Sequence, residues 1–149
     1  MSDDILDPEP FTVPAGFAPL NWRRGFGQVM GTLYDRAEAD GGFTRAFLVE
    51  ERHTNVMKNC HGGMLMAFAD TVFGHSVSLT RKDHHWVTIR ILTDFISPAA
   101  LGDWVEGTSE VVGRDGDLYT SRGRIWVGGR AVLTGTGIFK FATPRKASR

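Results

Sequence analysis

The sequence predicts an α+β domain in which one long central helix is wrapped by an antiparallel sheet of five to six strands. The run 64–79 is apolar on nearly every side, as in a buried helix. Extended runs rich in Val, Ile and Thr flank it, and turns such as Asp115-Gly116 join neighbouring runs into hairpins. Because such a sheet covers only one face of the helix, we expect a second copy of the chain to complete the core.

Length, charge and cysteine content limit the possible classes of protein. A chain of 149 residues fits one domain with a sizeable core. The 17 basic residues balance the 17 acidic ones, which argues against a nucleic-acid partner. A single cysteine excludes an internal disulfide and favours a cytoplasmic location. The acidic N-terminus lacks the apolar core of a signal peptide, and no apolar run reaches the ~20 residues of a membrane helix, so we expect no membrane partner.

The chain divides into an arm, a domain and a tail. Residues 1–20 are acidic and rich in proline, which predicts a flexible arm docked at most by Phe11 and Phe17. Residues 21–143 form the domain, and residues 144–149 form a polar tail. Within the domain we expect a short helix over 21–30, and strands over 32–37, 42–50, 86–96, 104–112, 118–127 and 131–141.

Asp70 is the one formally charged residue between Gly62 and Leu79. A carboxylate within a buried helix is costly unless it is paired, hydrogen-bonded or protonated. It lies about two turns into the helix, so it cannot cap the N-terminus. A hydrogen bond to a neighbouring hydroxyl or amide explains Asp70 about as well as a catalytic role does.

The start of the helix is suited to binding a carbonyl oxygen. Gly62 and Gly63 place unsatisfied N–H donors at the positive end of the helix dipole, which stabilises developing negative charge. Asn55, six residues before His61, adds a neutral amide. Asp70 lies about 12 Å further along the helix, too far to serve the same start. An antiparallel second helix would bring its own Asp70 there, so we expect a site shared between two subunits.

Other catalytic arrangements fit less well. Ser76 lies in a near match to a nucleophile elbow, but the last glycine and the strand-to-helix turn are missing. Cys60 adjoins His61, and a packed free thiol explains it better than a nucleophile does. The five histidines show no recurrent ligand spacing, so we expect no metal site.

The Asn55, His61-Gly62-Gly63 and Asp70 pattern, with Ser97-Pro98-Ala99 after it, resembles the hotdog-fold acyl-CoA thioesterases of the PaaI-like (phenylacetate-degradation) type. The similarity covers roughly residues 30–142. It implies hydrolysis of an acyl-CoA thioester without a cofactor, since CoA is part of the substrate. It also implies homodimers or homotetramers that are dimers of dimers.

The resemblance assigns a role to each residue of the pattern. Gly62 N–H and the Asn55 side chain polarise the thioester carbonyl or hold the water. Asp70 of a second subunit activates the water or attacks directly. Thr88 occupies the position where this family often has a Ser or Thr that orients the water. His61 shapes the loop rather than transferring protons.

The substrate-binding candidates rest on weaker signals. Gly63 would approach the substrate through its backbone. The CoA phosphates need cations, for which Arg81, Arg90, Lys82 and Arg145 are candidates, although an ordinary solvated charge explains each of them.

Two other functions remain alternatives to thioester hydrolysis. A hotdog protein with the same apolar helix and glycine start would bind acyl-CoA or another apolar ligand without hydrolysing it. A hydratase would use Asp70 together with His75, but a helical spacing of five residues places them about 140° apart.

Overall fold

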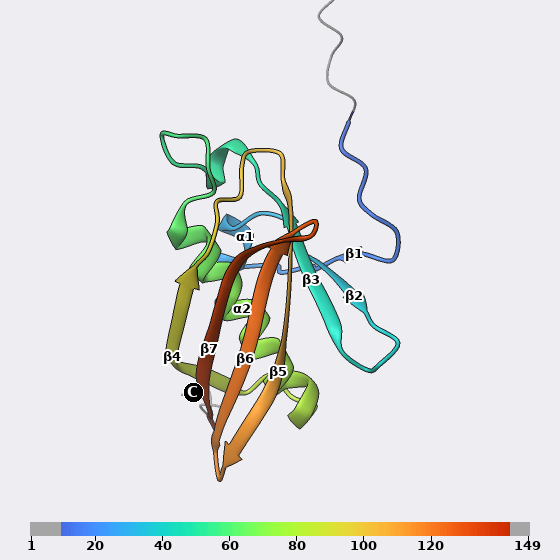
Figure 1. The fold of residues 1–149 in the computed structure, drawn as a ribbon. Helices are drawn as coiled ribbons and strands as arrows, with labels where there is room; N and C mark the ends of the chain where they lie inside the picture. Colours follow the sequence, from blue (N-terminus) through green and yellow to red (C-terminus); the bar gives the residue numbers. More distant parts are fainter. Residues whose placement is uncertain (1–9, 144–149) are drawn as a thin grey trace, which may run out of the picture.

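The computed structural model describes residues 10–143. One long helix, α2 (Gly62–Arg81), lies in the concave face of a seven-stranded antiparallel sheet (Figure 1). In sheet order the strands are β1 (Ala18–Pro19), β2 (Tyr34–Ala37), β3 (Phe43–Leu48), β5 (Trp104–Asp115), β6 (Leu118–Val127), β7 (Arg130–Phe141) and β4 (Trp86–Phe95). The predicted α+β class, with a sheet wrapped round a central helix, is confirmed.

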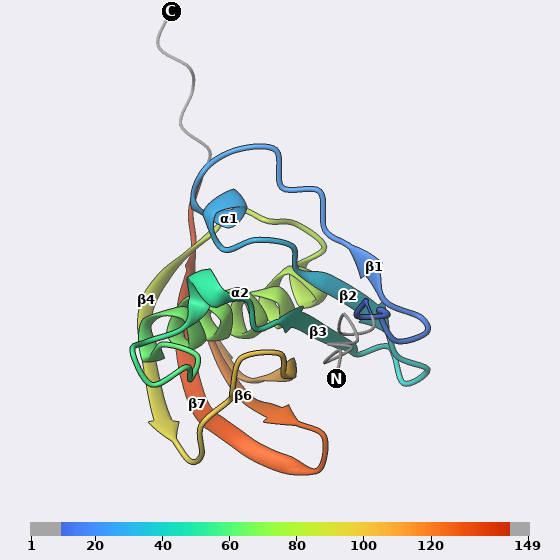
Figure 2. The same ribbon diagram turned by 90° about the horizontal axis from the view of Figure 1, so that it is seen from above.

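Two short helices complete the fold. Figure 2 shows α1 (Phe26–Val29) on the side of α2 that the sheet leaves open. The 3₁₀ helix η1 (Glu51–His53) connects β3 to the loop before α2. Within residues 10–143, the structure contains no helix of the length and apolarity that a membrane crossing requires.

The seventh strand, β1, comes from the range predicted as an arm. Ala18 pairs with Asp35 through backbone hydrogen bonds, which require no apolar pattern and so leave no signal in the sequence. Phe11 and Phe17 both dock on the Trp104 ring, with ring centroids 5.2 and 5.3 Å away. The predictions for residues 1–9 and for the 144–149 tail lie outside the described residues.

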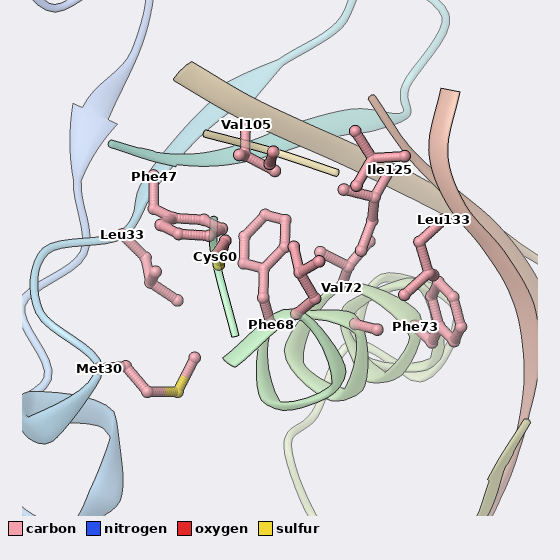
Figure 3. Packing of buried hydrophobic residues seen from close by; sticks show 14 of the residues in the cluster. Met30, Leu33, Phe47, Cys60, Phe68, Val72, Phe73, Val105, Ile125 and Leu133 are labelled. Atoms are coloured by element: carbon pink, nitrogen blue, oxygen red, sulfur yellow. The ribbon is translucent and has the colours of Figure 1, made fainter. Parts of the chain in front are cut away.

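The core lies between α2 and the inner face of the sheet. Leu65, Phe68 and Val72 of the helix are buried against strand residues such as Val105 and Ile125 (Figure 3). Leu79, the last residue of the apolar run that predicted a buried helix, is instead 45% exposed, because a recess opens between the end of α2 and β5. The apolar stripe therefore predicts the buried face correctly except in its last turn.

Small residues let α2 approach the sheet closely. Gly123 of β6 and Gly135 of β7 are cross-strand partners. A Cβ atom on them would lie 2.2 and 3.1 Å from the Phe73 ring, respectively. In the sequence, Gly135 and Gly137 lie two residues apart on one face of the last strand, which predicts a close approach by the helix, whereas Gly123 gives no such signal. Gly137 instead packs against Phe139 of its own strand, where an added Cβ would lie 2.5 Å from the ring.

Strand β4 forms one edge of the sheet and carries apolar side chains that remain exposed. It pairs with β7 alone among the described residues, and a bulge interrupts the register between Thr88 and Arg90. Contiguous exposed apolar residues on an open strand edge are typical of a surface that another chain covers. These residues are Val87, Ile89 and Leu92.

Candidate functional site

The start of α2 leaves one backbone donor free. His61 is the N-cap residue, and its Nδ1 accepts a hydrogen bond of 2.9 Å from the Gly63 N–H. Its carbonyl oxygen accepts from the Met64 and Leu65 N–H groups. In the described part of the chain, the Gly62 N–H has no acceptor. The expectation of two unpaired glycine donors therefore holds for Gly62 only, because a histidine cap occupies the other.

The loop before the helix is a rigid structure built by Asn55. Its side-chain Oδ1 accepts from the Met57 N–H at 2.9 Å and from the Asn59 N–H at 3.3 Å, as Asn side chains often do in turns. Its backbone N–H donates to the Asn59 carbonyl at 2.8 Å. These bonds occupy the amide oxygen of Asn55, so the chemistry left to its side chain is donation through Nδ2.

Asp70 and Thr88 form a hydrogen-bonded pair. The Thr88 hydroxyl donates to Asp70 Oδ1 at 2.6 Å. Asp70 is half-buried on α2, and Thr88 is exposed on β4 at the bulge. The structural and the catalytic interpretation of Asp70 are thus both compatible with this geometry. Asp70 has a hydroxyl partner at Oδ1, and its Oδ2 atom has no hydrogen-bond partner among the described residues.

The two halves of the predicted site lie on one stripe of α2 but do not meet. Gly62, Met66 and Asp70 follow each other at intervals of four residues, which places them on the same side of the helix. Eight residues separate Gly62 from Asp70, or about 12 Å. Within one chain, the free donor and the carboxylate therefore cannot act on the same bond.

His75 lies in a different environment from Asp70. Its Nε2 is 3.8 Å from the carboxylate of Asp35, and its ring packs edge-on against Phe43 at 4.5 Å. Asp35 in turn pairs with Arg45, so His75 faces β2 and β3, whereas Asp70 faces β4. The two side chains point to different sides of α2, which removes the structural basis for a hydratase pair.

Burial and the nearby Arg45 guanidinium lower the pKa of His75 from 6.5 to about 4. Between these values the unfolded chain binds a proton that the folded chain does not, so stability falls as the pH drops from 6.5 to 4. We expect the wild-type protein to lose about 2–3 kcal/mol more than His75→Gln between pH 7 and pH 4, at roughly 1.36 kcal/mol per pKa unit. Urea unfolding at both pH values measures this difference, and parallel losses in the two proteins would contradict it.

The other nucleophile and ligand candidates have structural partners. Burial raises the pKa of the Cys60 thiol to about 12, so it is protonated at neutral pH. The Ser76 hydroxyl donates to the Phe73 carbonyl inside the helix. His53 is buried, with Nδ1 accepting from the Glu50 N–H and Nε2 bonded to the Met30 carbonyl. No cluster of three potential metal ligands occurs in residues 10–143.

The two arginine candidates differ in whether their guanidinium groups are free to bind a CoA phosphate. Arg81 donates to the Tyr119 hydroxyl at 2.9 Å, pairs with Asp83 at 3.3 Å and lies 3.8 Å above the Phe141 ring. These contacts connect the end of α2 to the sheet, so we do not retain Arg81 as a CoA contact. Arg90 is exposed on β4 and has no carboxylate partner among the described residues. Lys82 is the exposed left-handed C-cap of α2, and Arg145 lies outside the described residues.

Phe95 is a neighbour of Gly62 that the sequence analysis did not identify. An ideal Cβ on Gly62 would lie 3.5 Å from the Phe95 ring. The sequence signal that could have indicated Phe95 is an aromatic residue at the end of a predicted strand, directly before Ile96-Ser97-Pro98. A recess of about 940 Å³ lies elsewhere, between the β2–β3 turn, the end of α2 and β5–β7, and none of the predicted site residues lines it.

Comparisons with known proteins identify the family of the chain. The family model described as "Thioesterase superfamily" matches residues 57–134, just over half of the chain. A putative esterase of Pseudomonas aeruginosa is 29% identical over 128 residues, covering 85% of this chain and 96% of that protein. Human acyl-coenzyme A thioesterase 13 is 28% identical over 89 residues, covering 60% of this chain and 64% of that protein.

A solved structure shares the fold. A variant of the phenylacetic acid degradation protein PaaI from Thermus thermophilus superposes with a TM-score of 0.68 at 26% identity, covering 79% of this chain and 98% of that one. The predicted resemblance and enzyme class, a hotdog-fold thioester hydrolase, are confirmed by these matches. The chain belongs to the thioesterase superfamily.

Proposed function

We propose that this protein hydrolyses an acyl-CoA thioester to a free acid and CoA. The observation that carries the proposal is that Gly62, whose N–H is unpaired, and Asp70 lie on one side of α2, with Thr88 of β4 bonded to the Asp70 carboxylate. An oxyanion donor and a positioned carboxylate can together hydrolyse a thioester. Membership of the thioesterase superfamily supports the same reaction.

In the proposed mechanism the Gly62 N–H donates to the thioester carbonyl oxygen and stabilises its developing negative charge. The Asn55 Nδ2 group adds a second donor to this oxygen or to the attacking water. Asp70 either takes a proton from water, whose oxygen attacks the carbonyl carbon, or attacks that carbon itself. The C–S bond then breaks, and the sulfur leaves as a thiolate that is protonated to give CoA. In the second route, water then hydrolyses the acyl–Asp70 anhydride, which releases the acid and restores the carboxylate. Thr88 holds Asp70 in position, and no cofactor takes part.

The site is complete only when two copies of the chain meet. If the α2 helices of two copies run antiparallel about a two-fold axis, Gly62 of one copy lies opposite Asp70 of the other. The exposed apolar side chains of β4 beside this stripe offer the surface that such a pairing would bury. We therefore propose a homodimer with two shared sites, and a dimer of dimers as its larger assembly.

This symmetry makes a specific prediction for Met66. Gly62 and Asp70 are each four residues from Met66, so the two-fold axis must pass beside that residue. We expect Met66→Cys, a site that is 38% exposed, to form a disulfide between two copies under mild oxidation. Non-reducing electrophoresis should show a covalent dimer that persists on dilution. The native Cys60 does not compete, because it is only 6% exposed and its pKa is raised to about 12.

Leu118→Cys provides a matched control for the cross-linking. Leu118 is 42% exposed but lies at the β5–β6 hairpin, away from the proposed axis. It should remain uncrosslinked under the same conditions. A dimer in solution whose Met66→Cys variant does not cross-link would show that the shared-site geometry is wrong.

A panel of acyl-CoA thioesters tests the reaction itself. Release of free thiol from at least one thioester, at a rate proportional to enzyme, is the expected result. Saturable acyl-CoA binding by calorimetry without any thiol release would favour the non-catalytic binding protein instead. The lone free cysteine accords with the cytoplasmic location that we propose for the reaction.

A further inference from the structure

Exposed apolar side chains, here called the rim, lie on two adjoining segments near the start of α2. The loop 55–60 and the segment 96–101 lie side by side: the Cys60 N–H donates to the Ala99 carbonyl at 2.7 Å, and the Leu101 N–H donates to the Lys58 carbonyl at 2.9 Å. The loop 55–60 leads into α2, and the segment 96–101 follows Phe95, the last residue of β4. Together with Phe95, the two segments present large apolar side chains that remain exposed: Val56 at 100%, Met57 at 75%, Phe95 at 52%, Ile96 at 57% and Leu101 at 43%.

Within this rim, the Phe95 ring lies beside Gly62, the residue that carries the proposed oxyanion donor. Its Cζ and Cε1 atoms lie 3.5 and 3.6 Å from the position of a Cβ on Gly62, which is ordinary van der Waals contact. One edge of the ring thus faces the glycine across the space that a Cβ would fill, and 52% of the residue remains exposed. Because β4 ends at Phe95 and is held to β7 by the Phe95↔Leu133 pairing, the ring is presented by a fixed strand.

We propose that Phe95 is the residue that determines acyl-group specificity, and that the preferred substrates are CoA thioesters of apolar acyl groups of about six or more carbons. This inference rests on the proposed function. A carbonyl oxygen bound by the Gly62 N–H places the first carbons of the acyl group beside Gly62, and therefore beside the Phe95 ring. The open part of the ring is then the nearest apolar surface to the chain, and Met57 extends the same surface.

The chemistry of the rim favours the acyl group over the pantetheine arm of CoA. Pantetheine carries two amide groups, which lose free energy when they are removed from water without hydrogen-bond partners. The rim side chains have no hydrogen-bonding atoms apart from the weakly accepting sulfur of Met57. A hydrocarbon chain gains roughly fourfold in binding for each methylene buried on such a surface. The acyl group is therefore the part of the substrate that this rim recognises.

The test compares acetyl-, butyryl-, hexanoyl- and octanoyl-CoA with wild-type protein, Phe95→Ala and Phe95→Leu. In the wild type we expect kcat/KM to rise at least about fiftyfold from acetyl to octanoyl. In Phe95→Ala the octanoyl-to-acetyl ratio should fall about tenfold or more, mainly through KM. Phe95→Leu, which keeps an apolar side chain and guards against a folding defect in the alanine variant, should give an intermediate ratio.

The control is Leu118→Ala, which removes an exposed apolar side chain at the β5–β6 hairpin and should keep the wild-type ratio. Mass measurement in solution verifies that the variants keep the wild-type assembly. A Phe95→Ala variant with the wild-type ratio, or with an equal loss for every chain length, overturns the specificity role while leaving thioester hydrolysis intact. A wild-type protein that hydrolyses none of the four thioesters overturns the specificity proposal, and it overturns the proposed function as well if no other acyl-CoA of the wider panel releases thiol.

Discussion

Asp70→Asn should lower kcat for acyl-CoA hydrolysis by about 10³-fold or more, within the range that a positioned base or nucleophile contributes. The amide has nearly the same shape as the carboxylate, and its oxygen still accepts the hydrogen bond from Thr88, which is 2.6 Å long in the wild type. It cannot take a proton from water or form an acyl intermediate. The loss should therefore appear in kcat for every thioester, with little change in KM.

Thiol release under saturating substrate measures this loss, and thermal unfolding verifies that the variant remains folded. Asp115→Asn, at the exposed β5–β6 turn, is the matched control and should keep wild-type turnover. If Asp70→Asn hydrolyses the whole panel at the wild-type rate, Asp70 is not the catalytic group. The pair with Thr88 would then be structural.

Arg45→Ala should destabilise the protein by about 3 kcal/mol, the lower end of the range for breaking a buried ion pair. Arg45 makes a bidentate pair with Asp35, with nitrogen–oxygen distances of 2.7 and 2.8 Å, and donates to the Thr71 carbonyl at 2.8 Å. Its side chain is 6% exposed, and that of Asp35 is 21% exposed. Removal of the guanidinium leaves a largely buried carboxylate without its partner, and α2 loses its bond to β3.

Urea unfolding at pH 7 measures the change. The exposed pair Arg122–Glu110, at 2.8 Å with side chains 67% and 64% exposed, provides the control. Arg122→Ala should cost no more than about 0.5 kcal/mol, since water replaces the lost interaction. The double variant Asp35→Asn with Arg45→Ala should recover part of the stability, because no uncompensated charge remains. A loss below about 1 kcal/mol for Arg45→Ala would show that Asp35 is solvated well enough to need no partner.

Hydrophobic patterning predicted most of the secondary structure. The helix expected over 64–79 spans Gly62–Arg81, and the strand expected over 118–127 has those bounds. The pattern underestimated β5, expected to end at Val112, because a bulge between Val111 and Gly113 breaks the alternation while the strand continues to Asp115. It also missed β1, whose two residues carry no periodic signal.

The residues of the candidate site differ in how well local sequence patterns predicted them. Asp70 stands out in the sequence because a charge within an apolar helix requires an explanation, and Gly62 stands out because it begins that helix. Thr88 was identified through family resemblance, since nothing in an alternating strand shows that one hydroxyl reaches a carboxylate 18 residues earlier. Phe95 was not identified, because its contact with Gly62 depends on the path of β4 beside α2.

The sequence alone determined the fold class, the buried face of the central helix and the identity of its one unusual charge. These properties follow from local periodicity and from the cost of burying a carboxylate, both of which can be seen in one segment at a time. Only the tertiary structure decided that His61 caps α2 and leaves a single free donor, that His75 faces the Arg45 cluster, and that Phe95 lies beside Gly62. Such contacts join segments far apart in the chain, so their distances depend on how the helix packs in the sheet.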